Sequence, residues 1–163
     1  MADRHHVLFL STGNSVRSIL AEAILNHRSH GRFTAHSAGS HPTGLVRPEA
    51  LQQVESAGIP TTGLRRKSWD EFRGPSAPVL YFVFTVCDNA LSELRPNWPG
   101  CPMRAHWGVP DPAAVKGTPG EIARAFHDAF VVLDRRVELF LSLPFETLEQ
   151  LAIKNRLDEM GRS

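Results

Sequence analysis

Short apolar runs recur along the chain, separated by longer stretches in which apolar residues fall every three or four positions. The clearest run, PVLYFVFTV at 78–86, is β-branched and aromatic. It shows no alternation with polar residues, as expected for a strand buried on both faces of a sheet. The predicted strands are residues 6–10, 33–37, 78–86 and 104–109.

The stretches with helical spacing lie between and after these strands. Pro48 occupies the first position of one helix, and Gly31 and Pro144 end two others. Thr118 and Glu121 have the spacing of a capping box at the start of a long helix. The predicted helices are residues 16–30, 48–57, a short segment from Ser68, 119–143 and 147–160.

Strands that alternate with helices predict an α/β fold. We expect a three-layer sandwich around a four-stranded parallel sheet. Residues 1–163 would form a single domain, with residues 145–163 as a C-terminal helical extension. Ligands of such sheets bind beyond the carboxyl ends of the strands. The loop 11–18 and residues 87–89 each follow a strand directly, so they are expected to share one crevice.

The composition is that of an ordinary soluble globular protein, with 42% hydrophobic and 21% charged residues. A net charge of +1 predicts no broad basic surface for nucleic acid. The longest apolar run, 79–86, is too short to span a membrane, and no signal-peptide pattern opens the chain. The two cysteines do not make a disulfide framework, and the eight histidines show no zinc spacing. The expected location is therefore the cytoplasm, where thiols stay reduced.

The polar stretch STGNSVRS, between the first strand and the first helix, has the features of an oxyanion-binding loop. Successive backbone N–H groups can form an anion nest, and the following helix contributes its positive end. Gly13 permits a tight turn, and Arg17 can hold two oxygens of a tetrahedral oxyanion. The predicted oxyanion-binding residues are Ser11, Thr12, Gly13, Asn14, Ser15, Val16, Arg17 and Ser18.

Two other interpretations of this loop have to be weighed. A nucleotide-binding P-loop is excluded, because no Gly-Lys-Ser/Thr follows four residues after a glycine. A plain strand-to-helix turn with a solvated arginine remains the structural alternative.

The chain resembles the low-molecular-weight tyrosine phosphatase superfamily, and its arsenate reductase branch in particular. The resemblance rests on STGNSVRS together with AEAIL, HSAGSHPTG, KSWDEF, FVFTVCDNA, WPGCPM and HWGVPDPA, which occur in the same order. It implies a flavodoxin-like sandwich and the reduction of arsenate to arsenite by a cysteine thiol relay. It also implies an external reductant, thioredoxin-like or a low-molecular-weight thiol, with no tightly bound cofactor.

The resemblance also assigns roles by position. Ser11 occupies the place of the nucleophilic cysteine, and Arg17 with the loop backbone would hold arsenate or phosphate. Asp111 resembles the general acid that protonates the leaving oxygen, although alone it would be an ordinary turn residue before a proline. Cys87 resembles a relay cysteine, although alone it would be a small core residue. Asn14 resembles the asparagine that holds the loop in shape.

Some members of the family bind a potassium ion near the loop. The positions that match that site are Asn14, Glu22, Ser37, Ser68 and Asp70.

Three positions depart from the family pattern. Ser11 is an alcohol, which is harder to ionise than a thiol and cannot form a disulfide. Arg95 stands where the similar reductases have a third cysteine, and Cys101 could supply that thiol from six residues further on. Ser11 fits either a replaced native cysteine or a natural relative that lost catalysis, and Arg95 favours the second origin.

We therefore expect an arsenate reductase-type protein that binds arsenate, phosphate or sulfate but does not turn over with serine at position 11. Two alternatives stay open. One is a non-catalytic module that binds or senses oxyanions. The other is a phosphomonoester or tyrosine phosphatase.

Overall fold

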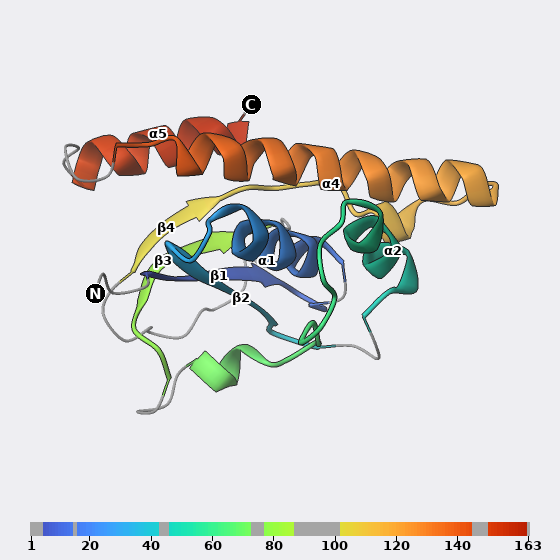
Figure 1. Ribbon diagram of the computed structural model, residues 1–163, viewed down its shortest axis with the longest axis horizontal. Coiled ribbons are helices and arrows are strands. Elements are labelled where there is room, and N and C mark those ends of the chain that lie inside the picture. Colours follow the sequence, from blue (N-terminus) through green and yellow to red (C-terminus); the bar gives the residue numbers. More distant parts are fainter. Residues whose placement is uncertain are drawn as a thin grey trace.

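Within the part of the chain that the structure describes, four parallel strands form one sheet in the order β2-β1-β3-β4 (Figure 1). The computed structural model describes residues 5–14, 16–42, 46–72, 77–86, 102–144 and 150–162. The strands are β1 (His5–Ser11), β2 (Phe33–Gly39), β3 (Leu80–Thr85) and β4 (Met103–His106). The predicted α/β fold with a four-stranded parallel sheet is confirmed.

The α-helices that the structure describes lie on one side of this sheet, and a described 3₁₀ helix lies on the other side (Figure 1). The α-helices are α1 (Arg17–Arg28), α2 (Pro48–Ser56), α4 (Pro119–Leu141) and α5 (Gln150–Arg162). The 3₁₀ helices are η1 (Trp69–Phe72), which covers the opposite face, and η2 (Pro112–Ala114). None of the helices that the structure describes is long and apolar enough to cross a membrane.

Both faces of β1 are buried, which explains why its sequence does not alternate. Val7 and Phe9 pack among α1, α2 and α4, whereas Leu8 and Leu10 pack toward η1. Phe84 on β3 stacks on Trp107 with 4.0 Å between ring centroids. Full burial of each such side chain contributes about 1.5–3 kcal/mol to the free energy of folding. The sheet is therefore a rigid platform for the loops at its carboxyl edge.

Of two helix starts predicted from capping patterns, one forms as expected and the other forms only in part. Thr118 accepts a hydrogen bond from the backbone N–H of Glu121 at 3.2 Å, which confirms the predicted start of α4. Ser68 accepts one from the N–H of Asp70 at 3.1 Å, so it does begin a short helix. Glu71, however, pairs with Arg65 at 2.7 Å instead of closing a capping box, and the segment is a single 3₁₀ turn.

The fourth strand is shorter than predicted. It ends at His106, although Trp107 still donates its backbone N–H to the Thr85 carbonyl at 2.7 Å. Val109 donates likewise to Val86 at 3.1 Å. The polypeptide therefore stays beside β3 without continuing the regular ladder.

The helix α5 packs as part of the core. Its Leu157 is fully buried, and the carbonyl oxygen of Leu157 accepts the indole N–H of Trp107 at 3.1 Å.

The strand order places a topological switch point between β1 and β3. From β1 the chain crosses to β2 on one side, and β3 pairs with β1 on the other side. In sheets of this order the crevice beyond the carboxyl ends of these two strands is the usual ligand site. The loop 11–18 begins at this point, where the Val86 N–H donates to the Leu10 carbonyl at 2.9 Å.

Candidate oxyanion-binding site

Asn14 closes the loop that joins β1 to α1. It adopts a left-handed backbone conformation with φ 52°, which asparagine tolerates better than most residues. Its side chain is fully buried; Nδ2 donates to the Ser18 hydroxyl at 2.8 Å, and Oδ1 accepts the backbone N–H of Lys67 at 2.7 Å. These contacts hold the loop to α1 on one side and to the segment before η1 on the other.

Ser11 lies at the floor of the loop, where its side chain is 4% exposed. Its hydroxyl is 2.7 Å from that of Ser18 and accepts the backbone N–H of Asn14 at 3.2 Å. Within the part of the chain that the structure describes, neither partner is a base that could take the hydroxyl proton. Among the described residues, the Ser11 hydroxyl therefore has no hydrogen-bonded base of the kind that activates a serine nucleophile.

Arg17, the first residue of α1, extends toward the segment that follows β4. Its Nη1 donates to the Val109 carbonyl at 3.0 Å, and its Nη2 lies 3.8 Å from Oδ2 of Asp111. The Arg17 side chain is 18% exposed and that of Asp111 is 40% exposed. The fold thus brings a carboxyl group beside the loop arginine from a distant part of the sequence.

Asp111 also has the turn role that its sequence context suggests. Its Oδ1 accepts the backbone N–H of Ala113 at 3.0 Å and so caps η2. This leaves Oδ2, the oxygen nearer Arg17, as the atom that can face a bound anion.

Gly39 is a site residue that the sequence reasoning missed. It ends β2, and a Cβ at this position would lie 2.5 Å from the Thr12 carbonyl oxygen and 3.0 Å from the Asn14 nitrogen. Only glycine permits this close approach. The signal was a glycine at the end of a strand, next to the strand that bears the loop.

Lys67 is the second missed residue, and its ammonium lies where the resemblance suggested a potassium ion. Nζ is 2.8 Å from the Ser37 carbonyl oxygen and 3.3 Å from Oε1 of Glu22. Burial raises the pKa of Glu22, and the adjacent ammonium opposes that rise. Ser68 caps η1 and Asp70 is exposed, while the ammonium contacts Glu22 and Ser37, two of the five matched positions. The potassium site at these five positions stays a prediction.

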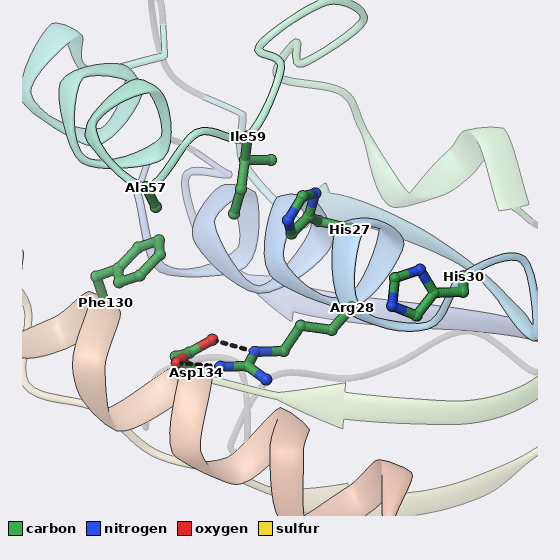
Figure 2. Close-up of a pocket in the computed structure, with 7 residues that line it drawn as sticks. All are labelled: His27, Arg28, His30, Ala57, Ile59, Phe130 and Asp134. Carbon is green, nitrogen blue, oxygen red and sulfur yellow. Dashed lines mark hydrogen bonds and ion pairs between the residues drawn. The ribbon is translucent and has the colours of Figure 1, made fainter.

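A pocket of about 390 Å³ lies away from the loop, at the C-terminal end of α1 (Figure 2). Its basic group, Arg28, forms a bidentate ion pair with Asp134 at 2.5 and 2.9 Å. The carboxylate of Asp134 thus accepts hydrogen bonds from two nitrogens of the Arg28 guanidinium, Nε and Nη2. The residues that line it are His27, Arg28, His30, Ala57, Ile59, Phe130 and Asp134.

Several predicted site residues lie outside the described residues. They are Ser15, Cys87 and Cys101, and Arg95, one of the departures from the family pattern, also lies outside the described residues. The predicted crevice shared by the loop and residues 87–89 therefore stays a prediction. Among the residues that are described, no group of three or more His, Cys, Asp or Glu side chains could hold a metal ion.

Comparisons with known proteins identify the family of the chain. The family model of the low molecular weight phosphotyrosine protein phosphatases matches residues 6–154. An arsenate reductase of Shouchella clausii is 31% identical over 134 residues, which are 82% of this chain and 93% of that protein.

Solved structures show the same fold. An arsenate reductase in the phosphate binding state aligns over 85% of this chain and 97% of its own, with a TM-score of 0.65 and 21% identity. A thioredoxin-dependent arsenate reductase of Corynebacterium glutamicum aligns over 85% of this chain and 64% of its own, with a TM-score of 0.56 and 20% identity. By its sequence match over residues 6–154, the chain belongs to the low molecular weight phosphotyrosine protein phosphatase family.

Proposed function

We propose that this protein is of the arsenate reductase type and binds a tetrahedral oxyanion in the loop 11–18. The observation that supports the proposal most is the placement of Arg17 at the N-terminus of α1, beside Asp111 and in the loop that Asn14 closes. Arsenate, phosphate and sulfate share the charge and tetrahedral shape that such a loop accepts. The arsenate reductases among the similar proteins favour arsenate as the substrate of the lineage.

The binding free energy has three physical sources. A helix N-terminus such as the start of α1 offers backbone N–H groups that are not bonded within the helix, and the helix dipole favours negative charge there. Arg17 contributes charge-assisted hydrogen bonds from a planar fork, which is partly withdrawn from water. The fork already faces a carbonyl and a carboxylate oxygen, so its orientation is fixed before an anion arrives.

Reduction requires more than binding. Conversion of arsenate to arsenite takes two electrons and releases one oxygen as water, and two thiols supply the electrons when they join in a disulfide. Ser11 cannot take part in that disulfide, because it has no sulfur. The cysteines left for a relay are Cys87 and Cys101, and an external thioredoxin-like or low-molecular-weight thiol would regenerate them in a reducing cytoplasm.

We therefore expect the chain to bind oxyanions without turnover. In this account Asp111 is the group that would protonate the leaving oxygen once a thiol stands at position 11.

The experiment is to compare the protein with Ser11→Cys and Ser11→Ala. Arsenite formation is measured with a thioredoxin system, and phosphate release is measured from an aryl phosphate. We expect neither activity from the protein or Ser11→Ala, and arsenite formation from Ser11→Cys. Arsenate reduction by the unmodified protein that Ser11→Ala abolishes would overturn the proposal. Phosphate release by Ser11→Cys without arsenite formation would assign the lineage to phosphatases.

A non-catalytic oxyanion sensor is the second candidate. The buried hydroxyl of Ser11 favours it, because a neutral group removes the charge with which a thiolate would repel an anion. If Ser11→Cys gains neither activity while the protein binds phosphate, this second function is supported.

A further inference from the structure

The ammonium group of Lys67 lies in a shell of oxygen atoms contributed by three separate parts of the chain. Its Nζ is 2.8 Å from the Ser37 carbonyl, 3.1 Å from the Arg65 carbonyl, 3.3 Å from Oε1 of Glu22 and 3.4 Å from the Ser37 hydroxyl. The side chains of Lys67 and Glu22 are each 9% exposed. Carbonyl, hydroxyl and carboxylate oxygens gathered around one positive charge are the surroundings that a bound monovalent cation would have.

The main chain of the same residue holds the anion loop. The Lys67 N–H donates to Oδ1 of Asn14 at 2.7 Å, and its carbonyl accepts the N–H of Gly39 at 2.9 Å. Asn14 in turn bonds Ser18 and Ser11. A displacement of Lys67 would therefore reach the floor of the loop through Asn14 and through Gly39.

We infer that Lys67 is a tethered cation, which fixes the oxyanion loop in place of a free monovalent ion. The oxygens that could coordinate potassium already surround the ammonium, and a second positive charge beside it would be repelled. The inference rests on the proposed function only where it concerns oxyanion affinity. Lys67 is a positioning residue, because it acts on the anion through Asn14.

The buried carboxylate of Glu22 requires a positive charge beside it. Ser37 donates its hydroxyl to Oε1 of Glu22 at 2.9 Å, and Lys67 supplies the opposite charge. Without the ammonium, a buried carboxylate would face two backbone carbonyls and a hydroxyl. Such a cluster either takes up a proton or binds another cation. A shortened side chain at position 67 should thus create a vacant site for potassium.

The test is to measure thermal unfolding and phosphate affinity of Lys67→Ala in potassium chloride and in choline chloride at equal ionic strength. In choline we expect the midpoint of unfolding to fall by roughly 6 °C or more, because the partner of a buried charge has been removed. Phosphate affinity should fall by about tenfold. Potassium should restore most of both losses, whereas the unmodified protein should give the same values in the two salts.

Two further variants keep the result interpretable. Lys67→Met fills the space with a neutral chain, so it should lose stability without a potassium response. Lys154→Ala removes a lysine that pairs with Asp158 at 2.6 Å on α5, and it should show no potassium response. If Lys67→Ala folds in potassium chloride but not in choline chloride, the inference is supported. If Lys67→Ala folds in neither salt, and Lys67→Met folds with unchanged phosphate affinity, the inference is overturned.

The remaining outcomes separate this inference from the proposed function. A potassium response of the unmodified protein, or none in folded Lys67→Ala, would overturn the tethered cation. If potassium restores the unfolding midpoint of Lys67→Ala but no form binds phosphate, the tethered cation stands and the proposed oxyanion site fails.

Discussion

The side-chain carbonyl of Asn14 accepts the backbone N–H of Lys67 at 2.7 Å, although 53 residues separate the two in sequence. This bond connects the anion loop to the segment before η1, the 3₁₀ helix on the face of the sheet opposite α1. The loop is thus held by tertiary contacts as well as by its own sequence.

Replacement of Asn14 by alanine should damage both stability and binding. Asn14→Ala leaves the buried Lys67 N–H and the Ser18 hydroxyl without their partner and places alanine at φ 52°. The expected loss is roughly 2–4 kcal/mol, or about 5–15 °C in the unfolding midpoint. Phosphate affinity should fall as well. Asn26→Ala is the matched control, because Asn26 makes two similar bonds to Ala35, and it should lower stability without changing phosphate affinity.

A methyl group at Gly39 should displace the loop. In Gly39→Ala the new Cβ would meet the Thr12 carbonyl at 2.5 Å, so the strand end or the loop has to move. We expect a destabilisation of roughly 1–3 kcal/mol and a weaker phosphate complex, measured by urea unfolding and titration. Gly120→Ala, in the first turn of α4 with its nearest neighbour at 3.9 Å, should be neutral or stabilising. Equal behaviour of the two variants would contradict the close approach.

His36 should make the protein less stable in mild acid. Burial, followed by the charges of His6 and Lys67, lowers the pKa of His36 from 6.5 to about 4. Between these two pH values the unfolded chain binds a proton that the folded protein does not, so stability falls as the pH drops from about 6.5 to about 4. The pKa shift sets an upper limit of about 3 kcal/mol on the loss in the free energy of unfolding. The loss should be smaller than this limit, because the ring is partly exposed to water.

Urea unfolding at several pH values measures this slope. His36→Gln should flatten it between pH 6.5 and 4, although His6, whose pKa is also lowered by burial, retains a smaller contribution. An unchanged slope in His36→Gln would show that other groups cause the acid sensitivity.

The Arg28–Asp134 pair should contribute to stability and not to oxyanion binding. The two side chains are 38% and 28% exposed, so their mutual coupling in a double-mutant cycle should be about 0.5–1 kcal/mol. Arg28→Ala should leave phosphate affinity unchanged, because this guanidinium lies at the far end of α1 from the loop (Figure 2). A marked loss of affinity would instead make that pocket an anion site.

The sequence predicted the elements well where local signals decide them. The apolar run at 6–10 became β1 (His5–Ser11), and the Thr118 cap became the start of α4. The last strand was predicted too long because its apolar pattern continues past His106, where only single backbone bonds to β3 remain. The start of η1 at Ser68 was predicted, whereas its 3₁₀ form and the pairing of Glu71 with Arg65 were not.

The site was predictable only in its local part. STGNSVRS indicated the loop and Arg17, and the resemblance indicated Asp111, which the structure brings to 3.8 Å from Arg17. Lys67 was missed because it follows two arginines and a run of basic residues usually indicates a solvated surface. Its partner Glu22 is 45 residues away, and only the tertiary fold reveals that contact. The close approach of Gly39 to Thr12 is likewise a property of two neighbouring strands.

The most direct test of the oxyanion site is calorimetric titration of phosphate into the protein and into Arg17→Ala. Arg32→Ala is the matched control, because Arg32 also donates to a backbone carbonyl, that of Leu141 at 3.3 Å, but lies away from the loop. Loss of the charge-assisted bonds of Arg17 should weaken phosphate binding by about 10- to 100-fold, whereas Arg32→Ala should bind like the unmodified protein. No phosphate binding by the protein, or equal binding by Arg17→Ala, would contradict the account.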